Sequence, residues 1–371
     1  MLDIGFGAQL ASFIINPMLI ATSIGRKLVW IPIITLACLA GGCSLMSGDS
    51  KIDEGIVIAS KLTIRSTTAP AALPLAEVKR GDRLEILEQA QFKTPTRTNE
   101  WYKVRTKTKD AIEGWVEARS VINKSLVDKS QELFEKSKSI PSQGIGRLKV
   151  QTRLRLDPGG DVVTYLSRGM MVEIAGKTRT TFKPEKQRDS DDTDDSDEPE
   201  TRTVIWYQVR LPETEVLRAG WVGAQQVQLD VPDEILYLEG EGRRFTGWVV
   251  LDQTKDKKGV LKDNYVGFMK NLSTEGPIDF TRLWVLNYSP DQGRYVGGGI
   301  FDGLRGVLPV TLGTASGRKG FTIHELDENE QPVPAEYEVR RDGYRIFVNR
   351  LTPKLQVRKS ASKPHAGKHR K

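Results

Sequence analysis

The chain has 371 residues, of which 38% are hydrophobic and 28% are charged. This composition is ordinary for soluble domains and excludes a protein built mainly of membrane-spanning segments, and the length predicts two or three domains. The formal net charge of +7 equals that of the stretch from Lys354 to Lys371, which holds seven Lys or Arg and no acid. The rest of the chain is therefore close to electrically balanced.

Cysteine and histidine are too scarce for most metal and nucleophile sites. Both cysteines, Cys38 and Cys43, lie in an N-terminal apolar stretch, so the remaining chain can form neither a disulfide nor a cysteine-ligated metal site. The histidines are His324, His365 and His369, and the last two fall in the basic C-terminal stretch. A zinc site or a Ser-His-Asp triad would depend on His324 alone. The sequence therefore predicts no catalytic residue, no metal site and no cofactor.

Residues 1–43 have the pattern of a secretory signal, and a signal of ordinary shape would start at Met18. Arg26 and Lys27 precede an uncharged apolar run that ends in small residues immediately before Cys43. This ending resembles the lipobox of bacterial lipoproteins. The resemblance implies that Cys43 is acylated and becomes the mature first residue.

Two alternatives to acylation at Cys43 stay open. Cys38 is a second candidate for the lipid. An uncleaved transmembrane anchor is the other reading, because the span 28–48 is uncharged and reaches the ~20 residues that cross a bilayer. Either way, we expect the protein in the cell envelope, held at a membrane on its periplasmic or extracytoplasmic face.

Two parts of the exported chain repeat the same order of sequence blocks. Each part has an extended opening, an Arg-Gly or Arg-Gly-Asp turn, a Trp-Tyr strand and a closing Gly-Trp-Val. Apolar and polar residues alternate within the blocks, which is the period of half-buried strands, and the repetition indicates duplicated units. The blocks are Leu62–Ser66, Lys79–Ile86, Trp101–Arg105 and Gly114–Val116, and then Thr152–Leu156, Arg168–Ile174, Trp206–Arg210 and Gly220–Val222.

Four such blocks, twice in order, resemble the bacterial SH3-like (SH3b) domain. The resemblance covers residues 55–123 and 147–230 and implies two small SH3-like β-barrels in tandem. Residues 124–146 are the linker between them. Within it, Ser125–Lys136 has a partial apolar stripe and predicts a short helix with Ser125 as N-cap, with a solvated linker as the alternative.

In the SH3-like family, the groove beside the barrel often binds peptides or cell-wall stem peptides. The resemblance therefore makes the aromatic residues of the blocks the candidate ligand-binding residues. Adjacent residues of a strand face opposite sides, so one aromatic of each Trp-Tyr pair is expected in the core. The candidates are Trp101, Tyr102, Trp115, Trp206, Tyr207 and Trp221.

An acidic insert, residues 186–201, interrupts the second repeat with eight Asp or Glu. Its spacing lacks the loop glycine and the terminal glutamate of an EF-hand calcium site. A charged, disordered hairpin tip is the better interpretation.

Residues 231–350 predict an antiparallel β-rich domain, because strand-like runs alternate with turn residues. The runs are Thr246–Leu251, Tyr265–Met269, Thr281–Tyr288, Tyr295–Phe301, Val307–Leu312, Phe321–Leu326, Glu336–Arg340 and Tyr344–Val348.

Two features of this segment resemble functional sites, a phosphate-binding loop and a catalytic histidine, but neither pattern is complete. Gly297–Gly299 and Gly303 resemble a phosphate-binding loop, but no Gly-Lys-Ser/Thr follows, so a bend or bulge is expected. His324 lies near Glu325 and Asp327, yet strand alternation puts it on the polar face and predicts a surface histidine.

Residues 351–371 predict a basic, disordered tail, because this segment has too few apolar residues to pack. Its charge could attract anionic lipid or surface polymers, or serve only to keep the chain soluble. We expect no specific nucleic-acid partner for an exported protein.

The expected fold class is therefore mainly β: two tandem SH3-like barrels, a short helical linker and a C-terminal antiparallel domain. The expected function is a cell-envelope lipoprotein that acts as a binding or adaptor module for cell-wall peptides or envelope protein partners. Two alternatives remain: a wall-targeted hydrolase with its active site in 231–350, and a structural envelope scaffold without a glycan ligand.

Overall fold

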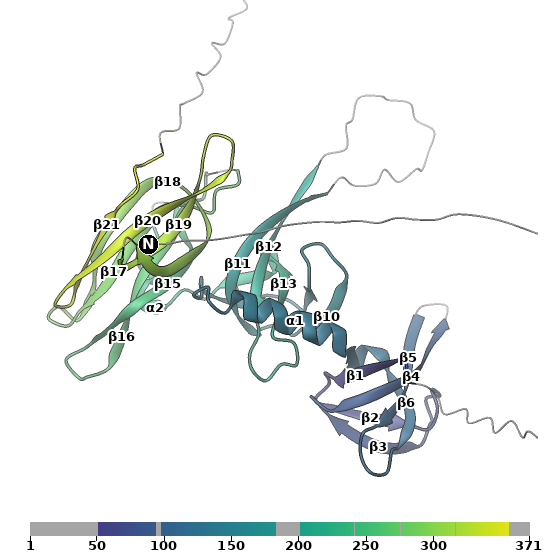
Figure 1. Cartoon of the computed structure of the whole chain (residues 1–371). Helices are drawn as coiled ribbons and strands as arrows, with labels where there is room; N and C mark the ends of the chain where they lie inside the picture. The colour runs from purple at the N-terminus through teal and green to yellow at the C-terminus, as the bar shows by residue number, and fades with distance from the viewer. Residues whose placement is uncertain are drawn as a thin grey trace, which may run out of the picture. The chain divides into compact units, whose positions relative to one another are not determined.

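The computed structural model describes residues 51–93, 98–182, 201–240, 242–274, 276–315 and 317–355. The predictions for the signal segment, Cys38, Cys43, the acids of the insert and the tail beyond Leu355 fall outside these residues. The described chain is mainly β, with three antiparallel sheets of seven strands each, so the mainly β expectation is confirmed (Figure 1). No helix within the described ranges has the length and apolar character needed to span a bilayer.

The first two sheets have the same strand order. The first runs β3-β2-β6-β5-β4-β1-β7 and the second β10-β9-β13-β12-β11-β8-β14, so each label of the first increases by seven. A short 3-10 turn precedes the last strand in both. The strands are β1 (Asp53–Val57), β2 (Lys61–Arg65), β3 (Pro74–Lys79), β4 (Arg83–Lys93), β5 (Thr98–Thr106), β6 (Glu113–Glu117) and β7 (Val121–Asn123), and then β8 (Ile145–Leu148), β9 (Thr152–Arg155), β10 (Val162–Leu166), β11 (Met171–Phe182), β12 (Arg202–Arg210), β13 (Ala219–Gly223) and β14 (Val227–Leu229).

The repetition extends to strand register. Tyr102 lies opposite Val116 in the first sheet, and Tyr207 lies opposite Val222 in the second. Each long hairpin also has an irregularity at the same place, immediately after Ile86 in β4 and after Ile174 in β11. The sequence repeat is therefore a repeat of pairing as well as of composition.

The glycine of each Gly-Trp-Val block is required by a close backbone crossing. A Cβ on Gly114 would lie 2.5 Å from the carbonyl oxygen of Arg65. A Cβ on Gly220 would lie 2.6 Å from Leu154 Cδ1 and 2.8 Å from the carbonyl oxygen of Arg155. No side chain fits at either position, which explains why the block carries glycine twice.

Helix α1 (Lys124–Ser137) follows the first sheet, within one residue of the predicted range at each end. Its N-cap is Asn123, so the assignment of Ser125 as N-cap was wrong; the chain leaves β7 directly into the helix. Ser130 is fully buried against β13, where its Oγ donates to the Ala219 carbonyl and accepts from the amides of Arg218 and Ala219. A serine at this position lets the helix approach the strand closely.

The third sheet is a meander in which each strand pairs with the next, in the order β15 to β21. The expected runs 295–301 and 307–312 are one strand, β18, because a bulge at Gly298 and a positive φ at Gly303 bend the chain without ending its pairing. This confirms the expected bulge. The strands are β15 (Arg243–Lys255), β16 (Leu261–Asn271), β17 (Phe280–Ser289), β18 (Arg294–Ala315), β19 (Arg318–Leu326), β20 (Pro332–Asp342) and β21 (Arg345–Arg350), preceded by α2 (Asp233–Leu236).

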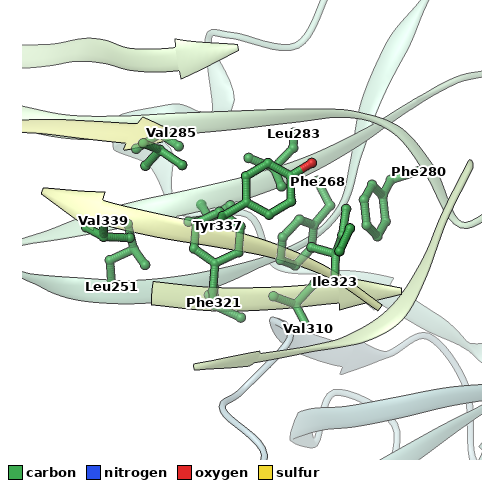
Figure 2. Packing of buried hydrophobic residues seen from close by; sticks show 14 of the residues in the cluster. Leu251, Phe268, Phe280, Leu283, Val285, Val310, Phe321, Ile323, Tyr337 and Val339 are labelled. Atoms are coloured by element: carbon green, nitrogen blue, oxygen red, sulfur yellow. The ribbon is translucent and has the colours of Figure 1, made fainter. Parts of the chain in front are cut away.

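The inner face of the third sheet is packed with side chains from all seven strands. The rings of Phe321 and Tyr337 stack with centroids 4.9 Å apart, and the rings of Phe268 and Phe280 stack at 5.1 Å (Figure 2). Leu251 and Val339 close one end of this core. Aromatic stacking of this kind fills the concave side of a curled sheet with few side chains.

Two polar contacts join the second sheet to the third. Gln143 is fully buried and exchanges side-chain hydrogen bonds with the backbone of Val310. Asp279 is buried and pairs with Lys177 at 2.8 Å and Arg179 at 2.5 Å, while its second oxygen accepts from the Leu308 amide. Burying a carboxylate is costly unless it is fully paired, as Asp279 is, so this cluster has a structural role.

Candidate functional site

A groove of about 600 Å³ lies beside the Trp-Tyr strand of the first sheet, and we call it groove 1. Trp101 and Tyr102 are both among its lining residues. Its apolar lining residues include Ile122, Leu126 of α1 and Val163 of β10, and we call these three the floor. Its volume is in the range of sites that bind small ligands or a few residues of peptide.

The two aromatic residues of groove 1 have different environments. Tyr102 packs on the core of the first sheet, and Trp101, its strand neighbour, faces the other side. Both are half-buried, which leaves part of each ring available to a ligand. Tyr102 packs on the first core as expected of one member of the pair, whereas Trp206 and Tyr207 are both buried, so the second pair is not divided between core and surface.

The rim of groove 1 is acidic. Glu100 accepts a hydrogen bond from Gln91 at 2.7 Å, and Glu117 pairs with Arg119 at 2.6 Å. Burial raises the pKa of Tyr102 above its usual value, and the negative charge of Glu100 adds to the shift. The phenol therefore stays protonated at neutral pH and can donate a hydrogen bond. Arg119 also lines groove 1 and balances Glu117, so the charged lining residues keep one net negative charge, which favours a peptide or other ligand that carries amine cations.

The other candidate aromatics do not join groove 1. Trp206, equivalent to Trp101, is buried, and its Nε1 donates to Thr180 Oγ1 at 2.8 Å while the Arg155 guanidinium lies 5.7 Å from its ring. Trp115 and Trp221 are half-buried on β6 and β13 and line neither groove. Tyr207 lines a different groove, described below.

Sequence reasoning missed the acids and the floor of groove 1. Glu100 and Glu117 lie directly beside the Trp-Tyr and Gly-Trp-Val blocks, and the register pairs Trp101 with Glu117. That adjacency could have identified both acids. The floor could not have been found in this way, because Val163 lies about sixty residues further along the chain in the other repeat.

The residues of 231–350 that could have formed an acid–base site are His324, Glu325 and Asp327, and each has a structural environment of its own. Glu325 is buried and pairs with Arg350 at 2.6 Å. Asp327 caps a turn by accepting from the amides of Asn329 and Gln331. His324 is half-buried on the strand face opposite this core, in agreement with the expected polar face. No cluster of three or more potential metal ligands occurs in the parts of the chain that the structure describes.

No protein-family model and no curated protein matches the sequence. The solved structures of NlpC2 and NlpC1 from Trichomonas vaginalis align with 80% of this chain, and with 91% and 87% of their own chains respectively. The sequence identities are 7% and 8%, and the TM-score is 0.15 in both cases. Overlaps of this quality carry no argument about fold or activity.

Proposed function

We propose that this protein is a cell-envelope lipoprotein that binds cell-wall peptides or envelope protein partners through its repeated sheets. The observation that carries the proposal is groove 1, which combines Trp101 and Tyr102 with an acidic rim and an apolar floor. Exposed aromatic residues beside satisfied polar groups are the usual anchors of peptide recognition.

The repeat supports an SH3-like interpretation of the two sheets. Both have seven short antiparallel strands in one order, both long hairpins carry the same irregularity, and both use a glycine at the β2–β6 or β9–β13 crossing. In this proposal the sheets are two tandem SH3-like barrels over 55–123 and 147–230, and α1 is the helix within the linker 124–146. The third sheet is then the separate β-rich domain over 231–350.

The proposed ligand is an extended peptide with at least one primary amine. A cationic nitrogen at the rim would face the Glu117 carboxylate beside the Trp101 ring, which lies opposite Glu117 in the strand register, and a cation–π contact there contributes roughly 0.5–2 kcal/mol. Aliphatic parts of the peptide would cover Ile122, Leu126 and Val163. Wall stem peptides have this combination of amines and short apolar side chains.

Co-sedimentation with peptidoglycan sacculi tests the wall-binding form of the proposal. Purified residues 51–371 and a chain that ends at Leu355 are pelleted with sacculi at low and high salt. Pelleting that resists salt and survives loss of the basic segment supports binding in the folded part. Pelleting that disappears with salt or with that segment indicates charge attraction alone. No pelleting at all would reject wall peptides and leave an envelope protein as partner.

Membrane attachment is tested separately. Labelled palmitate fed to cells that express the full chain should enter the wild-type protein and not the Cys43→Ser variant. Label that persists in Cys43→Ser and disappears in Cys38→Ser would move the lipid to the second candidate. Absence of label in the wild type, with the protein still in the membrane fraction, would favour the uncleaved anchor.

A further inference from the structure

A second groove, which we call groove 2, has a volume of about 540 Å³ and lies where the second sheet meets the start of the third. Tyr207 and Val227 of the second sheet line it. Leu236 of α2 and Phe245 of β15 also line it. Leu236 is 43% exposed and supplies the open apolar surface, whereas Tyr207, Val227 and Phe245 are buried.

Groove 2 occupies the same place in the second repeat as groove 1 does in the first. Tyr102 and Tyr207 are equivalent in strand register, since they lie opposite Val116 and Val222. Val121 and Val227 begin the last strand of each sheet, and each lines its own groove.

The helix after the last strand also contributes to both grooves. Leu126 of α1 lines groove 1, and Leu236 of α2 lines groove 2. The far side comes in each case from the sheet that follows, through Val163 of β10 and Phe245 of β15. Each repeat therefore creates a groove with the domain after it, from the same four kinds of element.

The charge of groove 2 is more negative than that of groove 1. Its lining residues include the carboxylates of Asp230, Asp233 and Glu239 against the single guanidinium of Arg244. Arg244 lies 3.5 Å from Glu239, and both are partly exposed. Glu239 also accepts the Phe245 amide at 2.9 Å, which fixes its carboxylate on the groove wall.

We propose that groove 2 is a second ligand site, for a peptide segment that carries primary amines, and that the chain therefore holds two sites at equivalent positions of the repeat. An amine near Asp233 and Glu239 would gain charge complementarity, and its aliphatic stem would cover the exposed Leu236. The ligand class rests on the proposed function of groove 1, whereas the existence of the site rests on the groove itself.

Two sites on one chain change how a repeating polymer is bound. Once one groove holds a polymer segment, binding of the next segment is intramolecular and is governed by an effective concentration. Avidity can then exceed the affinity of either groove by orders of magnitude. A polymer with regularly spaced amine-bearing peptides would be held more tightly than the free peptide.

Calorimetric titration with a synthetic pentapeptide of alternating alanine and lysine tests the proposal. The protein is the exported chain, residues 51–371, and the control peptide has glutamine in place of lysine. The wild type should bind two lysine peptides per chain. Asp233→Asn combined with Glu239→Gln should bind one, because the glutamine side chain keeps an oxygen that can accept the Phe245 amide. Glu117→Gln with Trp101→Ala should also bind one, and the combined variant none.

A second groove 2 variant tests the same site independently, in case the first variant fails to fold. Leu236→Lys places a positive charge in groove 2 at an exposed position and should also reduce the stoichiometry to one. If both groove 2 variants still bind two peptides, or if the wild type binds one and only the groove 1 variant loses it, the proposal is overturned. Equal binding of the glutamine peptide would reject the amine specificity.

The chain's own basic C-terminal segment is the competing occupant. If ending the chain at Leu355 raises the affinity of groove 2 alone, that groove belongs to the segment and the external-ligand proposal is overturned. Unchanged affinity supports it. This test is independent of the sedimentation test of the proposed function. If the chain binds two peptides but does not pellet with sacculi, both grooves remain ligand sites and only cell-wall binding is rejected.

Discussion

Gln143 and Val310 form a reciprocal pair of hydrogen bonds across 167 positions of sequence. The Val310 amide donates to Gln143 Oε1 at 2.7 Å, and Gln143 Nε2 donates to the Val310 carbonyl at 2.9 Å. The backbone of Gln143 adds two more bonds, donating to the Ile174 carbonyl and accepting from the Trp248 amide. One buried residue thus connects β11 of the second sheet with β15 and β18 of the third.

Replacing Gln143 with leucine should lower the free energy of unfolding by about 2–4 kcal/mol, because it leaves both backbone groups of Val310 buried without a partner. Gln131→Leu is the matched control, since Gln131 is exposed on α1 and bonds only Glu135. Denaturant unfolding should show less than about 0.5 kcal/mol for the control. Equal effects for the two variants would contradict the role of Gln143 at the junction.

The backbone crossings predict that Gly114→Ala and Gly220→Ala are destabilising to similar extents. The added Cβ would clash with a backbone carbonyl in both repeats, and overpacking of this kind costs roughly 1–3 kcal/mol or more. Gly313→Ala is the control, because no atom lies within 4 Å of its added Cβ. Thermal unfolding measures all three. If Gly114→Ala or Gly220→Ala melts at the wild-type temperature, the close crossing of the two strands at that glycine is contradicted.

Ser130→Ala should loosen α1 from the second sheet. The variant removes the oxygen that accepts the amides of Arg218 and Ala219, so two donors lose their partner, and about 2–3 kcal/mol of stability is lost. Ser125→Ala is the control, since Ser125 is exposed and is not the N-cap. Hydrogen exchange should speed up in α1 for Ser130→Ala only. Unchanged protection of α1 would contradict this contact.

The raised pKa of the buried Tyr337 should lower the free energy of unfolding at alkaline pH. Burial raises its pKa to about 12, with the Arg350 guanidinium opposing and the Glu325 carboxylate adding to the shift. The folded state therefore keeps a proton that the unfolded state releases above about pH 10, so stability falls from pH 10 towards 12.

Tyr337→Phe should reduce this alkaline fall by about 1–2 kcal/mol, because the phenylalanine has no proton to lose. At neutral pH the variant should be less stable by about 1 kcal/mol, since Arg350 loses a hydrogen-bond acceptor. Urea unfolding at several pH values between about 7 and 11.5 provides the comparison. Parallel pH profiles for the two proteins would refute the assignment.

Local sequence patterns were sufficient to predict the repeated strands. The Trp-Tyr and Gly-Trp-Val blocks alternate at the strand period, and the glycines mark crossings that tolerate no side chain. The bulge at Gly298 followed from the same reasoning. The continuity of β18 did not: the sequence predicted two runs separated near Gly303, but pairing with the neighbouring strands keeps the whole segment in one strand.

The site was predictable only in part. Trp101 and Tyr102 followed from the family resemblance, whereas Trp206 is buried, bonds Thr180 and contacts Arg155. Both grooves use a residue from the next domain, Val163 or Phe245. Periodicity along one segment contains no information about such contacts, because they depend on how α1 and α2 direct the chain.

The most direct test of groove 1 as a ligand site is salt-resistant pelleting of Trp101→Ala on peptidoglycan sacculi, beside the wild type. Phe347→Ala is the matched control, because Phe347 is an exposed aromatic residue outside both grooves. Loss of a central aromatic anchor should weaken binding at least about tenfold, while Phe347→Ala binds as the wild type does. Wild-type pelleting by a folded Trp101→Ala protein would contradict the account.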